Sequence, residues 1–170
     1  MFVDRIYMDN AATTRVTEPV FEAMRPYFGE IYGNPMSVHS FGREARKGVE
    51  EARRQVAAAL NAEPSEIYFT GCGTESDNWA IRGAAYANLR KGKHLITTQI
   101  EHHAVLHTCE QLEREGFNVT YLPVDEFGVV RMDALKAAIR PDTTLISVMA
   151  ANNEIGTIQP IEEIAKLAKE

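Results

Sequence analysis

The chain has 170 residues, of which 45% are hydrophobic and 25% are charged, a composition typical of a globular α/β protein. Its net charge of −6 and its lack of a basic cluster argue against nucleic acids and anionic membranes as partners. It has no apolar run of the roughly 20 residues that a membrane helix needs, no signal-peptide pattern and only two cysteines, so we expect a cytoplasmic protein.

The first third of the chain is predicted to be irregular apart from two helices. Thr17 and Pro19 are typical of a helix start and predict a helix over residues 17–28. A second helix is predicted after residue 40, because apolar residues recur there at helical spacing and the other faces are charged. These apolar residues are Ala45, Val49, Ala52, Val56 and Ala59.

From Glu66 onwards the sequence predicts strands and helices in alternation. The predicted strands cover residues 67–70, 94–98, 118–122 and 143–149. The predicted helices cover residues 74–90, 102–115, 132–139 and 161–170. Such alternation is typical of a mainly parallel sheet with helices on its faces, and ligands bind such sheets beyond the carboxyl ends of the strands.

The turn after the first predicted strand, TGCGTE, has the features of a phosphate-binding site. Gly71 and Gly73 would let the backbone turn tightly and approach a ligand, and the first amides of the following helix point outward at its positive end. With the hydroxyl of Thr74 they predict a phosphate cradle. An ordinary glycine-rich turn with Thr74 as the helix cap is the alternative.

Polar residues also follow two later predicted strands. His102 and His103 come after the strand that ends near Thr98, and Asn152 and Asn153 come after the strand over residues 143–149. A capping histidine and an asparagine turn are the alternatives, and a metal site lacks a third ligand at useful spacing. An imidazole, an amide and a phosphate cradle at one sheet edge suit a flat phosphorylated aromatic ligand such as pyridoxal phosphate.

Five motifs in fixed order give the chain a resemblance to a known family. They are YMDNAATT (7–14), YGNPMSVHSFG (32–42), FTGCGTESDNWAIRG (69–83), EHHAVL (101–106) and NNEIGTIQPI (152–161). The chain resembles the N-terminal part of NifS/IscS-type cysteine desulfurases, which belong to the class V aminotransferases and depend on pyridoxal phosphate. The resemblance implies the aspartate aminotransferase-like fold, fold type I, of which this chain would form the N-terminal part of the large domain.

The resemblance also implies roles for particular residues toward pyridoxal phosphate. Gly73 and Thr74 would hold the phosphate, and Asn153 would donate a hydrogen bond to the phenolic oxygen of the ring. His102 would stack on the ring and act as the catalytic acid and base. No residue is expected to bind a metal.

The resemblance divides the chain into a segment 1–15 on the substrate side and a part 16–170 of the cofactor-binding large domain. Asn10 and Ala11 would contact the substrate. Cys72 stands where many relatives have glycine, a change that a cradle of backbone amides tolerates.

The activity implied is conversion of L-cysteine to L-alanine, leaving an enzyme-bound persulfide for iron–sulfur cluster assembly or other sulfur transfer. None of the lysines is well placed to hold the cofactor as a Schiff base. We therefore expect that lysine and the persulfide cysteine on a complementary C-terminal chain, with the complete unit forming a homodimer that serves a sulfur acceptor such as an iron–sulfur scaffold. The alternatives are another class V activity such as selenocysteine lyase, or a non-catalytic half-domain that binds a ligand or partner.

Overall fold

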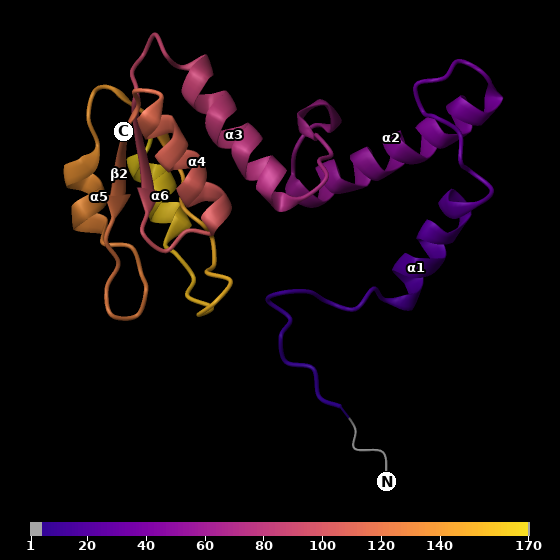
Figure 1. Cartoon of the computed structure of the whole chain (residues 1–170), viewed down its shortest axis with the longest axis horizontal. Helices are drawn as coiled ribbons and strands as arrows, with labels where there is room; N and C mark the ends of the chain where they lie inside the picture. The colour runs from indigo at the N-terminus through magenta and orange to yellow at the C-terminus, as the bar shows by residue number, and fades with distance from the viewer. Residues whose placement is uncertain (1–4, 170) are drawn as a thin grey trace. The chain divides into compact units, whose positions relative to one another are not determined.

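The computed structural model describes residues 5–169, so the first four residues of the predicted 1–15 segment and the last residue of the predicted C-terminal helix lie outside the described residues. The chain divides between Phe69 and Thr70 into two compact units. Figure 1 colours the first unit indigo to purple and the second magenta to yellow. The predicted boundary between residues 15 and 16 stays a prediction. No helix within residues 5–169 is long and apolar enough to cross a membrane.

The first unit contains helices and irregular segments. α1 (Glu18–Met24) follows Thr17, whose backbone is extended and whose side chain makes no capping hydrogen bond. It continues into a 3-10 helix, η1 (Arg25–Phe28). The predicted helix over residues 17–28 is therefore confirmed, with a tighter last part.

The long second helix is also present. α2 (Ser40–Leu60) runs for 21 residues and is followed by a short 3-10 helix, η2 (Pro64–Glu66). Ala45 and Ala57 are buried on α2, whereas Val56 of the predicted stripe is 37% exposed. The apolar face of this helix is therefore only partly covered.

The predicted strand over residues 67–70 is wrong. Ile67 has an extended backbone, but residues 67–70 pair with no strand among the described residues. The carbonyl oxygen of Ile67 instead accepts a hydrogen bond from the guanidinium of Arg53 on α2. An apolar run that follows the strand pattern cannot form a strand without a neighbour to share its backbone hydrogen bonds.

The second unit contains a sheet of three parallel strands, β1 (His94–Thr98), β2 (Asn118–Leu122) and β3 (Thr143–Ile146). Their order is β2-β1-β3, so β1 lies in the centre and pairs in parallel with both neighbours. These three predicted strands are confirmed, although β3 ends three residues before the predicted end at Met149. The hydrogen bond from Ser147 N to Ile96 O continues the pairing just beyond it, at 2.9 Å.

The four helices of this unit are α3 (Gly73–Ala87), α4 (His103–Arg114), α5 (Met132–Ala138) and α6 (Ile161–Leu167). Each matches a predicted helix with ends shifted by at most three residues, and α5 and α6 begin at the predicted residue. Gly116, at a φ of 88°, follows α4 and lets the chain turn into β2 in the left-handed conformation that favours glycine.

Helices cover both faces of the sheet, as predicted. Leu95 of β1 packs in a core cluster with buried residues of α3 and α4, which include Ile81 and Leu112. Its neighbour Ile96 points to the other face and packs in a second cluster with Leu135 of α5 and Ile164 of α6. Successive residues of a strand face opposite sides, so β1 connects the two cores.

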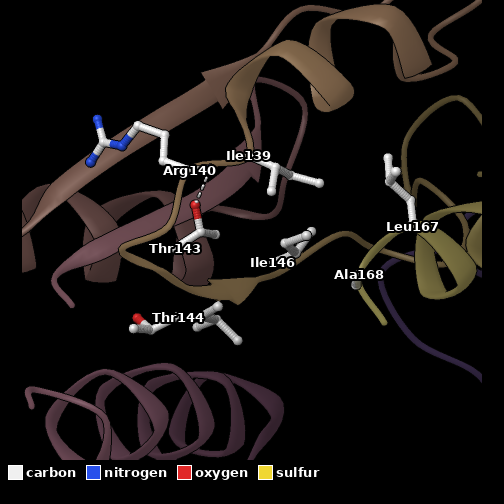
Figure 2. Close-up of a pocket in the computed structure, with 8 residues that line it drawn as sticks. Ile139, Arg140, Thr143, Thr144, Ile146, Leu167 and Ala168 are labelled. Atoms are coloured by element: carbon white, nitrogen blue, oxygen red, sulfur yellow. Dashed lines mark hydrogen bonds between the residues drawn. The ribbon is translucent and has the colours of Figure 1, made fainter. Parts of the chain in front are cut away.

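The outer edge of β3 carries a pocket of about 290 Å³. Its lining includes apolar residues of β3 and α6, and none of the predicted site residues belongs to it. Figure 2 shows the hydroxyl of Thr143 accepting a hydrogen bond from the backbone of Arg140, at 2.8 Å. Among the described residues, no strand pairs with this edge of the sheet.

A buried histidine ties the three strands together. His94 is fully buried, and its Nδ1 lies 2.7 Å from Oγ1 of Thr143 on β3. Its Nε2 lies 2.8 Å from Oγ1 of Thr120 on β2. Burial lowers the pKa of His94, because the charged imidazolium loses its hydration.

This environment predicts a pH-dependent stability. Since the pKa of His94 is lower in the folded state, the unfolded chain binds a proton first as the pH falls, and stability is lost below the unfolded pKa of about 6.5. The loss cannot exceed about 1.4 kcal/mol per pH unit for one proton. Thermal unfolding between pH 7.5 and 5.5 should therefore show a steeper decline for the wild type than for His94→Gln, which cannot titrate. Equal slopes would contradict the prediction.

Candidate functional site

The turn before α3 differs in detail from the predicted cradle. Cys72 occupies the N-cap position without a side-chain capping bond, so the alternative in which Thr74 caps the helix is wrong. The amide of Gly71 donates to Oε2 of Glu75 at 2.6 Å and is already in use. A Cβ on Gly73 would meet no atom within 4 Å. The free part of the cradle is therefore the first turn of α3, at Gly73 and Thr74.

The glycines of this turn do not adopt the left-handed backbone conformation that favours glycine. The positive-φ glycines are Gly116, Gly128 and Gly156, and neither Gly71 nor Gly73 is among them. The open space beside Gly73, rather than a tight turn, is what this position offers to a ligand.

A pocket of about 310 Å³ lies between α3 and α4 and is called the α3–α4 pocket here. It brings Thr74 and His102 together, as the sequence predicts for phosphate and ring contacts. The rest of its lining is mostly polar and consists of Asn78, Arg82, His103, Ala104, His107, Thr108 and Gln111. No lysine lines this pocket.

His102 caps α4 and still presents a free ring nitrogen. Its Nδ1 accepts a hydrogen bond from the amide of Ala104 at 3.1 Å, so the neutral imidazole carries its proton on Nε2. The ring is exposed, and it lies edge-on to His103 with the centroids 6.4 Å apart. The capping alternative is thus correct, and it leaves Nε2 available to donate or transfer a proton.

Two further imidazoles extend this polar surface along α4. His103 and His107 stack with their ring centroids 5.2 Å apart. Within residues 5–169, no three His, Cys, Asp or Glu side chains gather closely enough to hold a metal ion.

The two adjacent asparagines after β3 have different environments. Asn152 is buried, and its Oδ1 accepts hydrogen bonds from the backbone amides of Glu154 and Ile155 at 2.8 and 3.0 Å. Its Nδ2 donates to the carbonyl of Ile100 at 2.9 Å. Asn153 is exposed, and its amide donates to the side chain of Glu154 at 3.2 Å. Asn152 thus shapes the loop, and Asn153 remains accessible, although it does not line the α3–α4 pocket.

Glu101 directly precedes His102, and its surroundings could not be predicted from the sequence. It is 7% exposed, and its Oε1 accepts the hydroxyl of Thr98 at 2.8 Å and the amide of Met149 at 2.9 Å. Burial raises the pKa of Glu101, although both hydrogen bonds oppose that rise. In the sequence, Glu101 is only a charged residue between a predicted strand and a histidine pair. A charged residue in such a position is usually exposed, so its burial could not be predicted.

The predicted substrate contacts, Asn10 and Ala11, lie in the first unit. Both are exposed, in a turn where the amide of Ala12 donates to the carbonyl of Asp9 at 3.2 Å. The α3–α4 pocket, in contrast, is built from the second unit alone.

The two cysteines also differ. Cys72 is exposed before α3, and Cys109 is buried in the core between α4 and the sheet. Burial raises the pKa of Cys109 to about 11, so its thiolate is scarce at neutral pH.

Comparison with known proteins gives consistent matches along the chain. The family model "Aminotransferase class-V" matches residues 6–170. "Cysteine desulfurase IscS" of Methanosarcina thermophila is 61% identical over 165 residues, which are 97% of this chain and 41% of that protein. The chain thus spans about two fifths of the length of this curated relative.

Solved structures agree with these matches. A structure described as "NIFS-LIKE PROTEIN" superposes with a TM-score of 0.94 at 48% identity, covering 97% of this chain and 45% of that chain. "SspA in complex with cysteine" superposes with a TM-score of 0.90 at 44% identity, covering 96% of this chain and 47% of that one. The parallel sheet with helices on both faces is accordingly the N-terminal part of the large domain of fold type I. The chain belongs to the aminotransferase class V family and is similar to its NifS/IscS-type cysteine desulfurases.

Proposed function

We propose that this chain forms the N-terminal part of a cysteine desulfurase that depends on pyridoxal phosphate and converts L-cysteine to L-alanine and an enzyme-bound persulfide. The observation that carries the proposal is the α3–α4 pocket, where Thr74 at the uncapped start of one helix faces His102 at the start of another. The names of the relatives support the choice of reaction.

The residues present fit the cofactor. The amides of Gly73 and Thr74 lie in the first helical turn, where backbone N–H groups lack helical partners and the helix dipole favours an anion. The open space at Gly73 leaves room for phosphate oxygens, and the Thr74 hydroxyl adds a donor. The exposed imidazole of His102 can lie against an aromatic ring, and the amide of Asn153 can donate to its phenolic oxygen.

When bound, pyridoxal phosphate would stabilise the electron pair that remains on the α-carbon of an amino acid after the α-proton is removed. The proton chemistry falls to His102, because no group among residues 5–169 forms a hydrogen bond with its Nε2, whereas Nδ1 accepts the amide hydrogen of Ala104. This bond fixes the ring orientation and makes Nε2 a hydrogen-bond donor; to take a proton from substrate at Nε2, the ring must first carry its own proton on Nδ1 and release the bond from Ala104.

The anchoring lysine and the persulfide cysteine belong, in this proposal, to a complementary C-terminal segment. No lysine lines the α3–α4 pocket, and Cys109 is buried and protonated. The first unit also leaves large apolar side chains exposed for a further partner to cover. They include Val20, Phe21, Phe28, Tyr32 and Met36.

The complete unit is proposed to be a cytoplasmic homodimer that passes sulfur to an acceptor such as an iron–sulfur scaffold. Within it the segment 1–15 would close over the substrate side, and Asn10 and Ala11 would contact L-cysteine. Both are exposed in the first unit and free to do so.

The proposal can be tested on the full-length protein with added pyridoxal phosphate. We expect visible absorption from bound cofactor, and equal amounts of alanine and reducible sulfur from L-cysteine. Faster turnover of selenocysteine than of cysteine would favour a selenocysteine lyase. Cofactor binding without turnover of either would favour a binding module instead.

His102→Ala should retain the cofactor and lose turnover. If His102 transfers protons, kcat should fall by about 10²- to 10⁴-fold, whereas the phosphate contacts on α3 are untouched. His39→Ala, which removes an imidazole that caps α2 and does not line this pocket, is the matched control and should keep kcat near normal. Steady-state alanine production measures both, and near-normal turnover of His102→Ala would remove it from the mechanism.

Thr74→Val should weaken cofactor binding. The variant keeps the shape of the side chain but loses one charge-assisted hydrogen bond to phosphate, so the Kd for pyridoxal phosphate should rise by about tenfold to a hundredfold. Thr74→Ser retains the hydroxyl and should bind nearly as tightly as the wild type. Titration followed by cofactor absorbance gives both constants, and an unchanged Kd for the valine variant would count against the cradle.

Alanine variants of the two adjacent asparagines should have different effects, one on cofactor binding and the other on the stability of the fold. Asn153→Ala should raise the Kd for pyridoxal phosphate and leave the unfolding free energy within about 0.5 kcal/mol, because the side chain is exposed. Asn152→Ala should destabilise the fold by about 1–3 kcal/mol, since it leaves the carbonyl of Ile100 without its donor. Chemical denaturation and cofactor titration of both variants check the assignment, which fails if the two exchange behaviours.

A further inference from the structure

Two polar bridges join the segment that leads into α4 to the segment that follows β3. The first runs from Glu101 to the amide of Met149, and the second from Asn152 to the carbonyl of Ile100. Neither Glu101 nor Asn152 lines the α3–α4 pocket. These residues therefore do not meet a ligand there, yet each is next in sequence to a residue assigned to the cofactor.

Glu101 makes the more unusual of the two bridges. One carboxylate oxygen, Oε1, receives the hydroxyl of Thr98 at the end of β1 and the amide of Met149 beyond β3. Among the ion pairs of residues 5–169 none includes Glu101, and Asp77 of α3 lies near enough to disfavour its charge. A buried carboxyl group without a cation is costly, so its hydrogen bonds are what keep it in place.

The two bridges flank the functional positions. Residues 100 and 101 are both bonded to the segment 149–152, and His102 follows them directly as the N-cap of α4. On the other segment Asn153 directly follows Asn152. One bridge thus starts at the residue before His102, and the other starts at the residue before Asn153. Together they set the separation between His102 and Asn153.

We infer that Glu101 is a positioning residue, which holds His102 and Asn153 at a fixed separation by bonding the end of β1 to the segment after β3. This inference rests on the proposed function of those two side chains. Without the carboxyl group, Met149 and Thr98 lose their common acceptor, and the start of α4 can shift relative to the Asn152 loop. The phosphate contacts lie on α3 and do not depend on this bridge.

The inference predicts a split between binding and turnover. Glu101→Ala should raise the Kd for pyridoxal phosphate no more than Asn153→Ala does, because the phosphate contacts on α3 remain, while kcat falls by about tenfold to a hundredfold, because displacement of a catalytic group by about 1 Å has effects of this size. Glu101→Gln keeps an oxygen that can accept both donors and should restore most of kcat. Thr98→Val removes one donor and should have an intermediate effect.

A readout without cofactor or substrate tests the positioning itself. In the full-length protein, Glu101→Ala should speed hydrogen exchange of the Met149 amide and shift the NMR signal of the His102 ring, whereas the His103 ring should change little. Val130→Ala, which truncates a side chain that is 3% exposed in the core under α5, controls for a general loss of stability. If Glu101→Ala does not fold, Glu101→Gln and Thr98→Val give the same comparison.

The outcomes separate the two hypotheses. Unchanged Met149 exchange and an unchanged His102 signal in Glu101→Ala would overturn the positioning role, and so would equal effects in Val130→Ala. Failure of Glu101→Gln to restore the wild-type signals would overturn it too. If the wild type neither retains pyridoxal phosphate nor forms alanine, the proposed function fails, and the exchange and NMR measurements still decide the role of Glu101.

Discussion

The position of β1 at the centre of the sheet is the constraint on which the second unit depends. It pairs with both other strands, its successive side chains enter different cores, and its first residue, His94, bonds to a threonine on each neighbour. The residues that follow its last residue begin the polar loop before α4. The strand that organises the fold therefore also leads into the loop with His102, and α3, which covers one face, begins with the turn at Gly73 and Thr74.

The site is held together by backbone and buried polar groups rather than by the side chains that would contact a ligand. His102 is oriented by the amide of Ala104, and the asparagine loop is oriented by Asn152. The groups left accessible are the first turn of α3, the Nε2 atom of His102 and the amide of Asn153. Such a division is suited to a cofactor enzyme, in which the protein must present a few donors in fixed directions while the cofactor supplies the reactive group.

The sequence predicted the sheet well, because apolar runs and helical periodicity reflect burial on a scale of one element. It failed for residues 67–70, where the pattern was right but a pairing partner was lacking, and pairing is not a local property. It predicted that Thr74 and His102 meet, since both begin helices at one end of the sheet. The sequence could not show that the side chain of Glu75 accepts a hydrogen bond from the amide of Gly71, or that Glu101 is buried. Both depend on side-chain contacts that a sequence pattern does not encode.

The long sequence separation between the paired strands has a consequence for assembly of the chain. His94 meets Thr120 and Thr143, which lie 26 and 49 residues further along, so the sheet closes only after two helical crossovers have been made. Contacts of this kind form late, because the entropy of closing each loop must be overcome first. During synthesis the loop before α4 and the loop after β3 would thus acquire their geometry together, once β3 has paired with β1.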